Sequence, residues 1–496
     1  MTQGQIIIRY KDKSINEEIE SKLSFRKGES LLLLCEKAGI PLAAPCGGKG
    51  ICGGCRVYFE KGAPLPQPRE RKILSAEELR QGVRLGCVTR LSEDCVILIK
   101  EGKTDVISGK FDITWAQDAQ ITDKGCNQSG QSCFIVADIG TTTVILAKRN
   151  KSDGSVIDVY KAVNAQRKLG ADVMTRMEAS ISGRKEELKE LIGRQLSEGI
   201  TYLNQKGEQA DLLVVAANTT MVHLLMGLNV EKLAKAPFEP EIIHEAEWEV
   251  DGIKTYIMPG FSAFVGGDIA AGLYALNYLE EKEPAFPPGT GWKLFLDLGT
   301  NAEMVLYRDK QGFATAAAAG PAFDGAAGTG FFGSDVVALL AKLYREGIVD
   351  ETGTLDDAHF ETGFSLSLPE GTLTLSQEQI RQLQLAKAAV RCGIDVLLKK
   401  AGIRQEEIER VYLAGGFGYY LNPEDAAEIG LLPEDLAKKA VACGNTALLG
   451  AAVYGRMILR GENRMLPVQL QSINLARESD FMESYVNYIN LKADSQ

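Results

Sequence analysis

The residues best suited to chemistry in this chain are four cysteines, three of which lie close together in a glycine-rich loop. The loop reads Pro45-Cys-Gly-Gly-Lys-Gly-Ile-Cys-Gly-Gly-Cys55, which contains Cys46 and Cys52, and Cys87 follows thirty-two residues after its end. Thiolates are strong metal ligands, and glycines let the backbone turn through positive φ and direct N–H groups at the sulfur atoms. The pattern therefore predicts a metal centre held by these four cysteines.

The spacing of the four cysteines resembles the plant-type ferredoxin pattern, with one additional residue between the first two, as in the adrenodoxin-like [2Fe–2S] ferredoxins. This resemblance implies a [2Fe–2S] cluster with all four as ligands. The alternative is a structural zinc site. Zinc ribbons pair two C-x-x-C hooks, and Cys87 has no second cysteine three residues before or after it. The sequence therefore favours the iron–sulfur interpretation.

Composition excludes several classes of function. The chain has 496 residues, of which 45% are hydrophobic and 24% charged, as in an ordinary globular protein of about three domains. Its net charge of −11 argues against nucleic-acid and anionic-membrane partners. It contains no run of 18 apolar residues and no signal segment, so a cytoplasmic location is expected. A reducing cytoplasm preserves thiolate ligands and disfavours disulfides.

The six other cysteines are interpreted as small buried hydrophobic residues or as linker thiols. They stand at positions 35, 95, 126, 133, 392 and 443. Cys126 and Cys133 bracket a polar stretch, so a redox pair is an alternative for them, although their spacing matches no redox motif.

The N-terminal part of the chain, residues 1–101, has the pattern of a small β-rich domain. Strand-like apolar runs occur at residues 6–8, 57–59 and 96–99, and a short helix is expected over residues 31–37. This order is typical of a β-grasp ferredoxin, an α+β fold. Residues 102–132 then have the polar, turn-rich composition of a linker.

A near-repeat marks the α/β region that begins at Cys133. An apolar strand ending in Asp138, a glycine turn and a second apolar strand recur 159 residues later around Asp297. Such turns can bind phosphate oxygens, and an aspartate at the strand end can hold Mg²⁺, often through water. One copy alone would be an ordinary hairpin. Two copies predict two lobes that hold one nucleotide between them. The predicted phosphate-binding positions are Gly140, Thr141, Thr142 and Thr143 in the first copy, and Gly299, Thr300 and Asn301 in the second.

Three further segments fit the same nucleotide site. The turn with Gly415, Gly416 and Gly418 follows an apolar run and predicts close approach of an adenosine to the backbone. Segments 265–272, which contains Asp268, and 444–452 are rich in small residues and are expected to form closely packed helices, either as a hinge between lobes or as ordinary helix packing. Neither G-x-G-x-x-G nor G-x-x-x-x-G-K-[ST] occurs, which argues against Rossmann and P-loop sites.

Together these motifs resemble the acetate and sugar kinase, Hsp70 and actin superfamily over residues 133–456. With the ferredoxin in front, the whole chain resembles the reductive activators of corrinoid proteins, which serve methyltransferase systems. The expected fold is multidomain, a β-grasp ferredoxin followed by a two-lobed α/β actin-like ATPase. The expected parts are a ferredoxin domain (1–101), a linker (102–132), two ATPase lobes (133–264 and 265–460) and a C-terminal tail (461–496). Some relatives carry another domain where this chain has only the linker.

The resemblance implies ATP-dependent transfer of one electron from the [2Fe–2S] cluster to a corrinoid protein, which returns its cobalt from Co(II) to Co(I). Plant-type clusters lie near about −400 mV, so the transfer is uphill, and ATP would act through differential affinity for two conformations. Mg²⁺ would accompany ATP, with Asp138, Asp268 and Asp297 as the catalytic carboxylates. An upstream electron donor is required, and a homodimer is compatible with the sequence.

Three alternatives stay open at this point. They are a reductive activator of another low-potential enzyme such as a dehydratase, a nucleotide-gated electron carrier with incidental ATP hydrolysis, and a kinase of a small metabolite. The three histidines, His223, His244 and His359, lie outside any D-x-H-x-x-G setting, so the corrinoid is expected on a separate protein.

Three charged residues have two interpretations each. Glu303 faces the nucleotide or a solvated edge, and Asp172 reaches the cleft or caps a helix. Lys387 touches the nucleotide or, as we expect, faces solvent, in a helix that begins with the capping box Ser376-Gln-Glu-Gln379.

Overall fold

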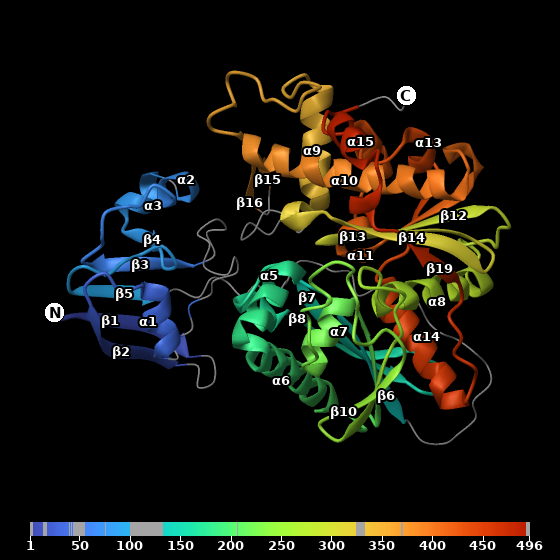
Figure 1. Cartoon of the computed structure of the whole chain (residues 1–496), viewed down its shortest axis with the longest axis horizontal. Helices are drawn as coiled ribbons and strands as arrows, with labels where there is room; N and C mark the ends of the chain where they lie inside the picture. The colour runs from blue at the N-terminus through green and yellow to red at the C-terminus, as the bar shows by residue number, and fades with distance from the viewer. Residues whose placement is uncertain are drawn as a thin grey trace. The chain divides into compact units, whose positions relative to one another are not determined.

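A computed structural model describes residues 3–12, 17–38, 40, 42, 55–74, 76–99, 132–205, 207–323, 333–368 and 371–492. The chain divides into two compact units. The first comprises residues 1–106 and 163–192, and the second comprises residues 107–162 and 193–496. Figure 1 shows the described helices and strands of both units.

The first unit contains a five-stranded sheet. Its order is β2 (Glu17–Arg26), β1 (Gln3–Asp12), β5 (Cys95–Ile99), β3 (Arg56–Lys61) and β4 (Val83–Leu85). β1 is parallel to β5, and the other neighbours are antiparallel. Helix α1 (Leu31–Lys37) buries Leu31 and Leu34 in one core with Ile6, Ile8 and Ile97 of the sheet. The α+β ferredoxin fold expected from the sequence is confirmed, and each strand-like run lies within a strand.

Two short helices, α2 (Glu70–Ile73) and α3 (Ala76–Arg80), precede β4, and residues 163–192 belong to the same unit. That segment holds η1 (Ala165–Lys168), α5 (Val173–Ala179), η2 (Ser180–Arg184) and the start of α6 (Lys185–Asn204). Asp172 is the N-cap of α5, because its carboxylate accepts the Thr175 N–H at 2.8 Å and the Thr175 hydroxyl bonds back to its backbone. Asp172 therefore caps a helix, one of its two predicted roles.

Two six-stranded sheets form the framework of the second unit. The first runs β10 (Ala246–Val250), β11 (Ile253–Ile257), β9 (Leu212–Ala217), β6 (Cys133–Ile139), β7 (Thr143–Asn150) and β8 (Val156–Val163). The second runs β18 (Ala440–Ala442), β17 (Ile408–Ala414), β12 (Trp292–Leu298), β13 (Asn301–Arg308), β14 (Gln311–Ala318) and β19 (Gln469–Ser472). Five successive strands of one sheet correspond to five of the other, with the sixth strand, β10 or β19, at opposite ends. In each sheet an antiparallel hairpin, β6–β7 or β12–β13, pairs its first strand in parallel with β9 or β17. The near-repeat in the sequence is thus a repeat of sheet topology.

Helices α8 (Gly267–Lys282) and α14 (Thr446–Arg460) share one hydrophobic core with both sheets of the second unit (Figure 1). Phe134 of β6 and Phe295 of β12 lie in this core. The two helices approach each other closely at Gly450, where an added Cβ would lie 1.7 Å from the Ala271 carbonyl oxygen. No side chain fits at that point, so the close packing expected for the two small-residue segments is confirmed.

A second core covers the other face of the second sheet. Leu294, Leu296 and Leu298 of β12 point into it, whereas Phe295 between them points into the first core, as the twofold alternation of a strand requires. Helix α7 (Thr219–Met226) follows β9 in the first sheet. The helices between β14 and β18 are η3 (Gly320–Phe323), α9 (Gly333–Arg345), α10 (Gln377–Ala401), η4 (Gln405–Glu407), α11 (Gly415–Gly418), α12 (Pro423–Glu428) and α13 (Glu434–Ala437). A short hairpin, β15 (Phe364–Leu368) and β16 (Gly371–Leu375), precedes α10.

The chain after residue 460 is part of this fold. β19 pairs in parallel with β14, and η5 (Leu475–Arg477) and α15 (Phe481–Asn487) follow it. Beyond α15 the backbone carbonyls of Tyr488 and Asn490 both accept hydrogen bonds from Lys387 Nζ on α10, each at 2.7 Å. Lys387 is fully buried, so the expectation that it faces solvent is wrong. The capping box that begins α10 is confirmed.

Replacing Lys387 with Met should destabilise the second unit by about 1–3 kcal/mol, because two carbonyl groups lose their donor. Burial also lowers the pKa of Lys387 to about 7, whereas an unfolded lysine titrates near about 10.4. Between these values the unfolded wild type binds more protons than the folded protein, so rising pH stabilises the wild type. Since the variant lacks this linkage, the difference in unfolding free energy should grow with pH, which denaturant titrations will measure.

Lys342→Met is the matched control for this substitution, because Lys342 on α9 is exposed. It should leave the unfolding free energy nearly unchanged at every pH. A Lys387→Met protein as stable as the Lys342→Met protein across this pH range would contradict the role assigned to Lys387.

Candidate functional site

Three aspartates predicted from the sequence come together in the second unit. Asp138 is the next-to-last residue of β6, and Asp297 is the next-to-last residue of β12. Asp268 lies in the first turn of α8. The charge of Asp138 acts on Asp268, and the charges of both act on Asp297. The carboxylates are thus positioned by two strand ends and one helix N-terminus.

Glu303 joins this acidic group from β13. It stands directly opposite Asp297 in the antiparallel pairing of β12 and β13, whereas the residue opposite Asp138 in the first hairpin is the apolar Ile145. Opposed residues of antiparallel strands carry their side chains on the same face of the sheet, about 5 Å apart. Glu303 is also buried, which excludes the solvated-edge interpretation.

Burial raises the pKa of all four carboxyl groups, and nearby negative charges raise the pKa of Asp268, Asp297 and Glu303 further. Burial raises the pKa of Asp138 to about 6. The pKa of Asp268 rises to about 7 because of burial and the charge of Asp138. Burial and both neighbouring aspartates raise the pKa of Asp297 to about 8, and the pKa of Glu303 lies well above its usual value. No lysine or arginine among the described residues pairs with the group, so a bound cation would relieve the repulsion.

The acidic group is not a closed metal cage. Within the part of the chain that the structure describes, no three carboxylate, imidazole or thiolate groups converge closely enough to hold one ion directly. Mg²⁺ keeps several water ligands and is commonly bound by one or two carboxylates together with phosphate oxygens. The oxygen-only donor set and its open spacing therefore fit a Mg²⁺ that is contacted partly through water.

The two glycine turns of the near-repeat face each other. The Thr142 and Thr300 hydroxyl oxygens lie 2.9 Å apart, which is hydrogen-bonding distance. Each turn is closed by a 2.9 Å hydrogen bond from its glycine N–H, at Gly140 or Gly299, to the backbone oxygen of the first residue of the next strand. The hydroxyl groups of both turns are therefore on the same side, where phosphate oxygens could be bound.

The third glycine motif adjoins the second turn. Gly415 follows β17 with φ +82°, and an added Cβ would lie 2.4 Å from an Asp297 carboxylate oxygen and 2.6 Å from the Leu298 carbonyl oxygen. Both the positive φ and this close approach require glycine. Gly416 has open space where a Cβ would stand, and Gly418 lies near the Leu298 side chain. The predicted adenosine turn at Gly415 is therefore adjacent to the end of β12, just before the second glycine turn.

Two asparagines beside the first turn were not assigned a role from the sequence. Asn445 donates from Nδ2 to Asp138 Oδ2 at 2.7 Å, and Asn218 donates from Nδ2 to Thr141 Oγ1 at 3.3 Å. Each is the N-cap residue of a helix, α14 or α7. An asparagine before a helical pattern predicts a cap, but the sequence does not show which residue its amide will contact.

Two of the four predicted cluster ligands lie within the described residues. Cys55 immediately precedes β3, and Cys87 follows β4 by two residues. Both side chains are buried, and the sulfur atoms lie 3.2 Å apart. The Gly86 N–H donates to the Cys55 carbonyl oxygen at 2.8 Å, which holds the two turns together. Cys46 and Cys52 lie outside the described residues, as does Cys126.

The thiol pair is chemically distinct from Cys95, another buried cysteine of the same domain. Hydrogen bonding from Cys87 lowers the pKa of the Cys55 thiol to about 7, whereas burial raises the pKa of Cys95 to about 12. Thiolates, and not thiols, bind iron. The paired sulfurs at the ends of two neighbouring strands therefore fit part of the ligand set of an iron–sulfur cluster, and Cys95 does not belong to it.

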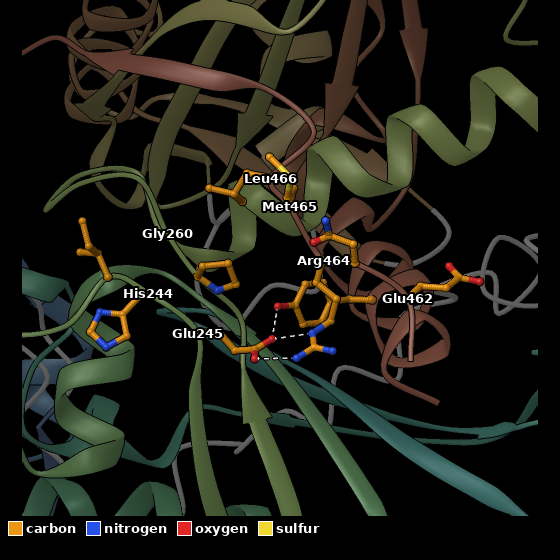
Figure 2. Close-up of a pocket in the computed structure, with 11 residues that line it drawn as sticks. His244, Glu245, Gly260, Glu462, Arg464, Met465 and Leu466 are labelled. Carbon is orange, nitrogen blue, oxygen red and sulfur yellow. Dashed lines mark hydrogen bonds and ion pairs between the residues drawn. The ribbon is translucent and has the colours of Figure 1, made fainter. Parts of the chain in front are cut away.

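A cavity of about 580 Å³ lies elsewhere in the second unit and contains none of the predicted site residues. Figure 2 shows that Glu245 faces Arg464 beside it, with carboxylate–guanidinium distances of 2.8 and 2.9 Å. The Tyr454 hydroxyl also donates to Glu245, and the Arg464 guanidinium lies over the Tyr256 and Tyr454 rings. The polar groups of Glu245, Tyr454 and Arg464 therefore satisfy one another.

Comparison with protein families assigns most of the chain. Residues 15–92 match the 2Fe-2S iron-sulfur cluster binding domain, residues 133–281 match the RACo middle region, and residues 291–329 and 326–496 match the C-terminal domain of RACo, the ASKHA domain. The chain belongs to the RACo family. The last match extends beyond Arg460, in agreement with the place of β19 in the second sheet.

Two curated relatives and one solved structure illustrate the family. The chain is 28% identical to the corrinoid activation enzyme RamQ of Eubacterium limosum over 71% of this chain and 69% of that protein. It is 26% identical to the [Co(II) methylated amine-specific corrinoid protein] reductase of Methanosarcina barkeri over 39% of this chain and 42% of that protein. The solved structure of a reductive activator for corrinoid,iron-sulfur protein matches with a TM-score of 0.62 at 22% identity, covering 99% of this chain and 98% of that one.

The comparisons agree with the fold of both units. The family matches place a ferredoxin domain in front of an ASKHA domain, and the solved structure shares the overall fold of the chain. They support a 2Fe-2S cluster and a bound nucleotide as cofactors. None of the described helices has both the length and the apolar character that a membrane crossing demands.

Replacing Cys87 with Ser should remove the cluster, because a hydroxyl is a poor ligand for iron in place of a thiolate. Anaerobically purified wild type should contain about two irons per chain and absorb as a red-brown [2Fe–2S] protein. Iron assays and visible spectra of the variant should show most of both signals lost. Cys95→Ser is the matched control, because that thiol is equally buried and should leave the iron content unchanged. Zinc in the wild type, or a full cluster in the Cys87→Ser protein, would refute the assignment.

Proposed function

We propose that this chain is an ATP-dependent reductive activator that passes one electron from a [2Fe–2S] cluster to a corrinoid protein and thereby converts its cobalt from Co(II) to Co(I). The observation that carries the proposal is the union of two sites in one chain. The Cys55–Cys87 thiol pair lies in a ferredoxin domain. The hairpin with Asp138 lies in the segment that matches the RACo middle region, and the facing hairpin with Asp297 lies in the segment that matches the ASKHA domain. The activity of the Eubacterium limosum relative, a corrinoid activation enzyme, supports the same conclusion.

Each predicted nucleotide residue receives a role in this proposal. Asp138 and Asp297 would hold the Mg²⁺ that accompanies ATP, and Asp268 would orient the water that attacks the terminal phosphate. The turn hydroxyls and N–H groups bind phosphate oxygens, and the glycines at 415, 416 and 418 admit the adenosine. The phosphate-binding residues are Gly140, Thr141, Thr142, Thr143, Gly299, Thr300 and Asn301. Glu303 adds negative charge beside Asp297 and strengthens the demand for a cation.

The cysteines have a separate task. Cys46, Cys52, Cys55 and Cys87 would ligate the [2Fe–2S] cluster, which supplies one electron at a time when bound. The buried position of the Cys55 and Cys87 sulfurs keeps that end of the ligand set away from water. An upstream low-potential donor of single electrons must reload the cluster after each transfer to cobalt.

ATP is needed because the electron transfer is uphill. A nucleotide can drive such a step only if the chain and its partner bind each other differently in the two nucleotide states. In the complex favoured by ATP, a changed axial ligand on the partner's cobalt would raise the cobalt potential and let the electron pass. Hydrolysis would then release the activated partner.

The corrinoid itself belongs to the partner in this proposal. His223 is buried, its Nδ1 lies 2.7 Å from the Thr219 carbonyl oxygen, and its Nε2 accepts the Glu241 N–H at 2.9 Å. Both ring nitrogens are occupied, so His223 is not available as a cobalt ligand. His359 is engaged by Asp356 at 2.7 Å. These contacts support a separate corrinoid protein as the substrate of the reaction.

Replacing Asp138 with Asn should weaken Mg²⁺-dependent ATP binding and hydrolysis by roughly 10- to 100-fold, because the metal loses a charged member of its surroundings. The visible spectrum of the cluster should not change, because Asp138 lies in the second unit and the cluster ligands lie in the first. Equilibrium binding of a fluorescent ATP analogue and a phosphate-release assay measure the two effects.

The control for this substitution is Asp211→Asn, an exposed aspartate just before β9 that pairs with Lys151. It should bind and hydrolyse Mg-ATP like the wild type. Undiminished hydrolysis by the Asp138→Asn protein would count against the two-lobe nucleotide site.

ATP should be required for formation of Co(I) in a corrinoid protein of a methyltransferase system. With a chemical reductant, the chain and the Co(II) partner, the Co(I) absorbance band should appear with Mg-ATP and stay near the baseline with Mg-ADP. By reciprocity, the Co(II) partner should raise nucleotide affinity or the hydrolysis rate, and the methylated partner should do so less. Anaerobic spectroscopy and nucleotide titration give both quantities.

The Cys87→Ser protein separates the two halves of this reaction. It should retain the partner's effect on hydrolysis and fail to produce Co(I). Equal Co(I) yields with and without ATP, together with an unchanged nucleotide affinity, would leave the chain as an electron carrier whose ATP hydrolysis is incidental.

A further inference from the structure

One asparagine connects the acidic group to a helix. Asn445 is the N-cap residue of α14, and its side-chain oxygen accepts the Leu448 N–H at 2.7 Å. Its amide nitrogen donates to an Asp138 carboxylate oxygen, also at 2.7 Å. The orientation of the amide is fixed on chemical grounds, because the helix offers only a donor and the carboxylate offers only acceptors. Both ends of this side chain are therefore committed.

The same arrangement occurs a second time on the same turn. Asn218 is the N-cap residue of α7, where its side-chain oxygen accepts the Met221 N–H at 2.9 Å. Its amide nitrogen donates to the Thr141 hydroxyl oxygen at 3.3 Å. Two helices thus begin with an asparagine whose side-chain amide nitrogen donates to Asp138, just before the first glycine turn, or to Thr141 within it. A cap alone could equally be serine, aspartate or threonine, none of which carries an amide donor.

We infer that Asn445 is a positioning residue for the nucleotide site, which holds the Asp138 carboxylate in place and ties it to the N-terminus of α14, with Asn218 doing the same for Thr141. The inference rests on the proposed function. The charge of Asp138 acts on both Asp268 and Asp297, and Asn445 supplies a hydrogen-bond donor to the Asp138 carboxylate at 2.7 Å.

The connection continues from α14 into α8. Gly450, one helical turn beyond the start of α14, lies against the Ala271 backbone of α8. Asp268 stands in the first turn of that second helix. Asn445 therefore closes a short path of direct contacts that runs from Asp138 through the two packed helices to Asp268. Loss of the amide donor should free Asp138 from the helix pair and leave the helices themselves intact.

Two substitutions separate the amide donor from the helix cap. Asn445→Ser keeps an oxygen that can accept the Leu448 N–H, but its side chain is too short to reach Asp138. Asn445→Ala loses both functions. Both variants should require roughly tenfold more Mg²⁺ for half-maximal binding of a fluorescent ATP analogue, in line with other residues that orient metal-binding carboxylates. Only Asn445→Ala should show a clearly lower melting temperature without nucleotide.

Asn422 provides the matched control. It is the N-cap residue of α12, where it accepts the N–H groups of Glu424 and Asp425, and it has no part in the proposed site. Asn422→Ala should lower the melting temperature as Asn445→Ala does, and Asn422→Ser should not. Neither Asn422 variant should change the Mg²⁺ requirement or the KM for Mg-ATP.

The results distinguish the two proposals. If the wild type binds the ATP analogue in a Mg²⁺-dependent manner but Asn445→Ser has the same Mg²⁺ midpoint, the positioning role is overturned and the nucleotide site stands. A shift of the Mg²⁺ midpoint in the Asn422 variants of the same size as in the Asn445 variants would also overturn it. If the wild type shows no Mg²⁺-dependent binding, the proposed function itself fails, and this inference fails with it.

Discussion

Repulsion between carboxylates that are held together out of water is the constraint on which the second unit depends. Asp138, Asp268, Asp297 and Glu303 come from four different elements, and no described cation pairs with them. Burial and like charges disfavour the ionised forms of such a group, which raises the pKa values of its members. Strand ends and a helix N-terminus hold it because each element is fixed by the hydrophobic cores behind it. A cost in stability of this kind is typical of functional sites and unusual elsewhere.

The repeated sheet topology explains how the group is assembled, and the differences between the copies indicate where its chemistry is concentrated. β6 and β12 both carry an aspartate as their next-to-last residue and are followed by a glycine turn, because the same hairpin geometry is used twice. The position across from the aspartate is Ile145 in one copy and Glu303 in the other. A framework residue would recur in both. The exchange of an apolar residue for a buried acid concentrates negative charge on the second hairpin, which is also the one that adjoins Gly415.

Sequence patterns were sufficient for everything that depends on local order. Continuous apolar runs in the near-repeat located the hairpin strands, the small residues around Gly450 indicated the helix crossing, and Ser376 with Gln379 marked the start of α10. What failed or stayed undecided depends on partners far away in the chain. Lys387 looks like a surface lysine until residues 488–490, about a hundred positions later, cover it.

The contacts of the site illustrate the same limit. Asn445 lies 307 residues from Asp138 in the sequence. The local sequence around Asn445 predicts only its cap hydrogen bond with Leu448 and does not indicate that its amide also contacts a carboxylate. Glu303 could be placed beside Asp297 only when the register of β12 against β13 was known, because a shift of one residue would turn it to the other face. The matching near-repeat predicts which residues belong to the site. The register of β12 against β13 and the asparagine caps of the helices determine how those residues are positioned.

Coupling between a nucleotide and a distant event requires an element with two arrangements that the nucleotide can distinguish. The two glycine turns would differ between the nucleotide-free and nucleotide-bound states. The Thr142 and Thr300 hydroxyl oxygens are only 2.9 Å apart, so a phosphate group bound by both would have to replace their contact. The sheets that carry the turns would then have to shift relative to each other. α8 and α14 pack with both sheets, and their crossing at Gly450 has no interlocking side chain, so small sliding there is the least costly response. Since Asp268 and Asn445 stand at the beginnings of these two helices, any such sliding reaches the carboxylates directly. The fold therefore links the spacing of the two turns to the geometry of the acidic group through one pair of helices.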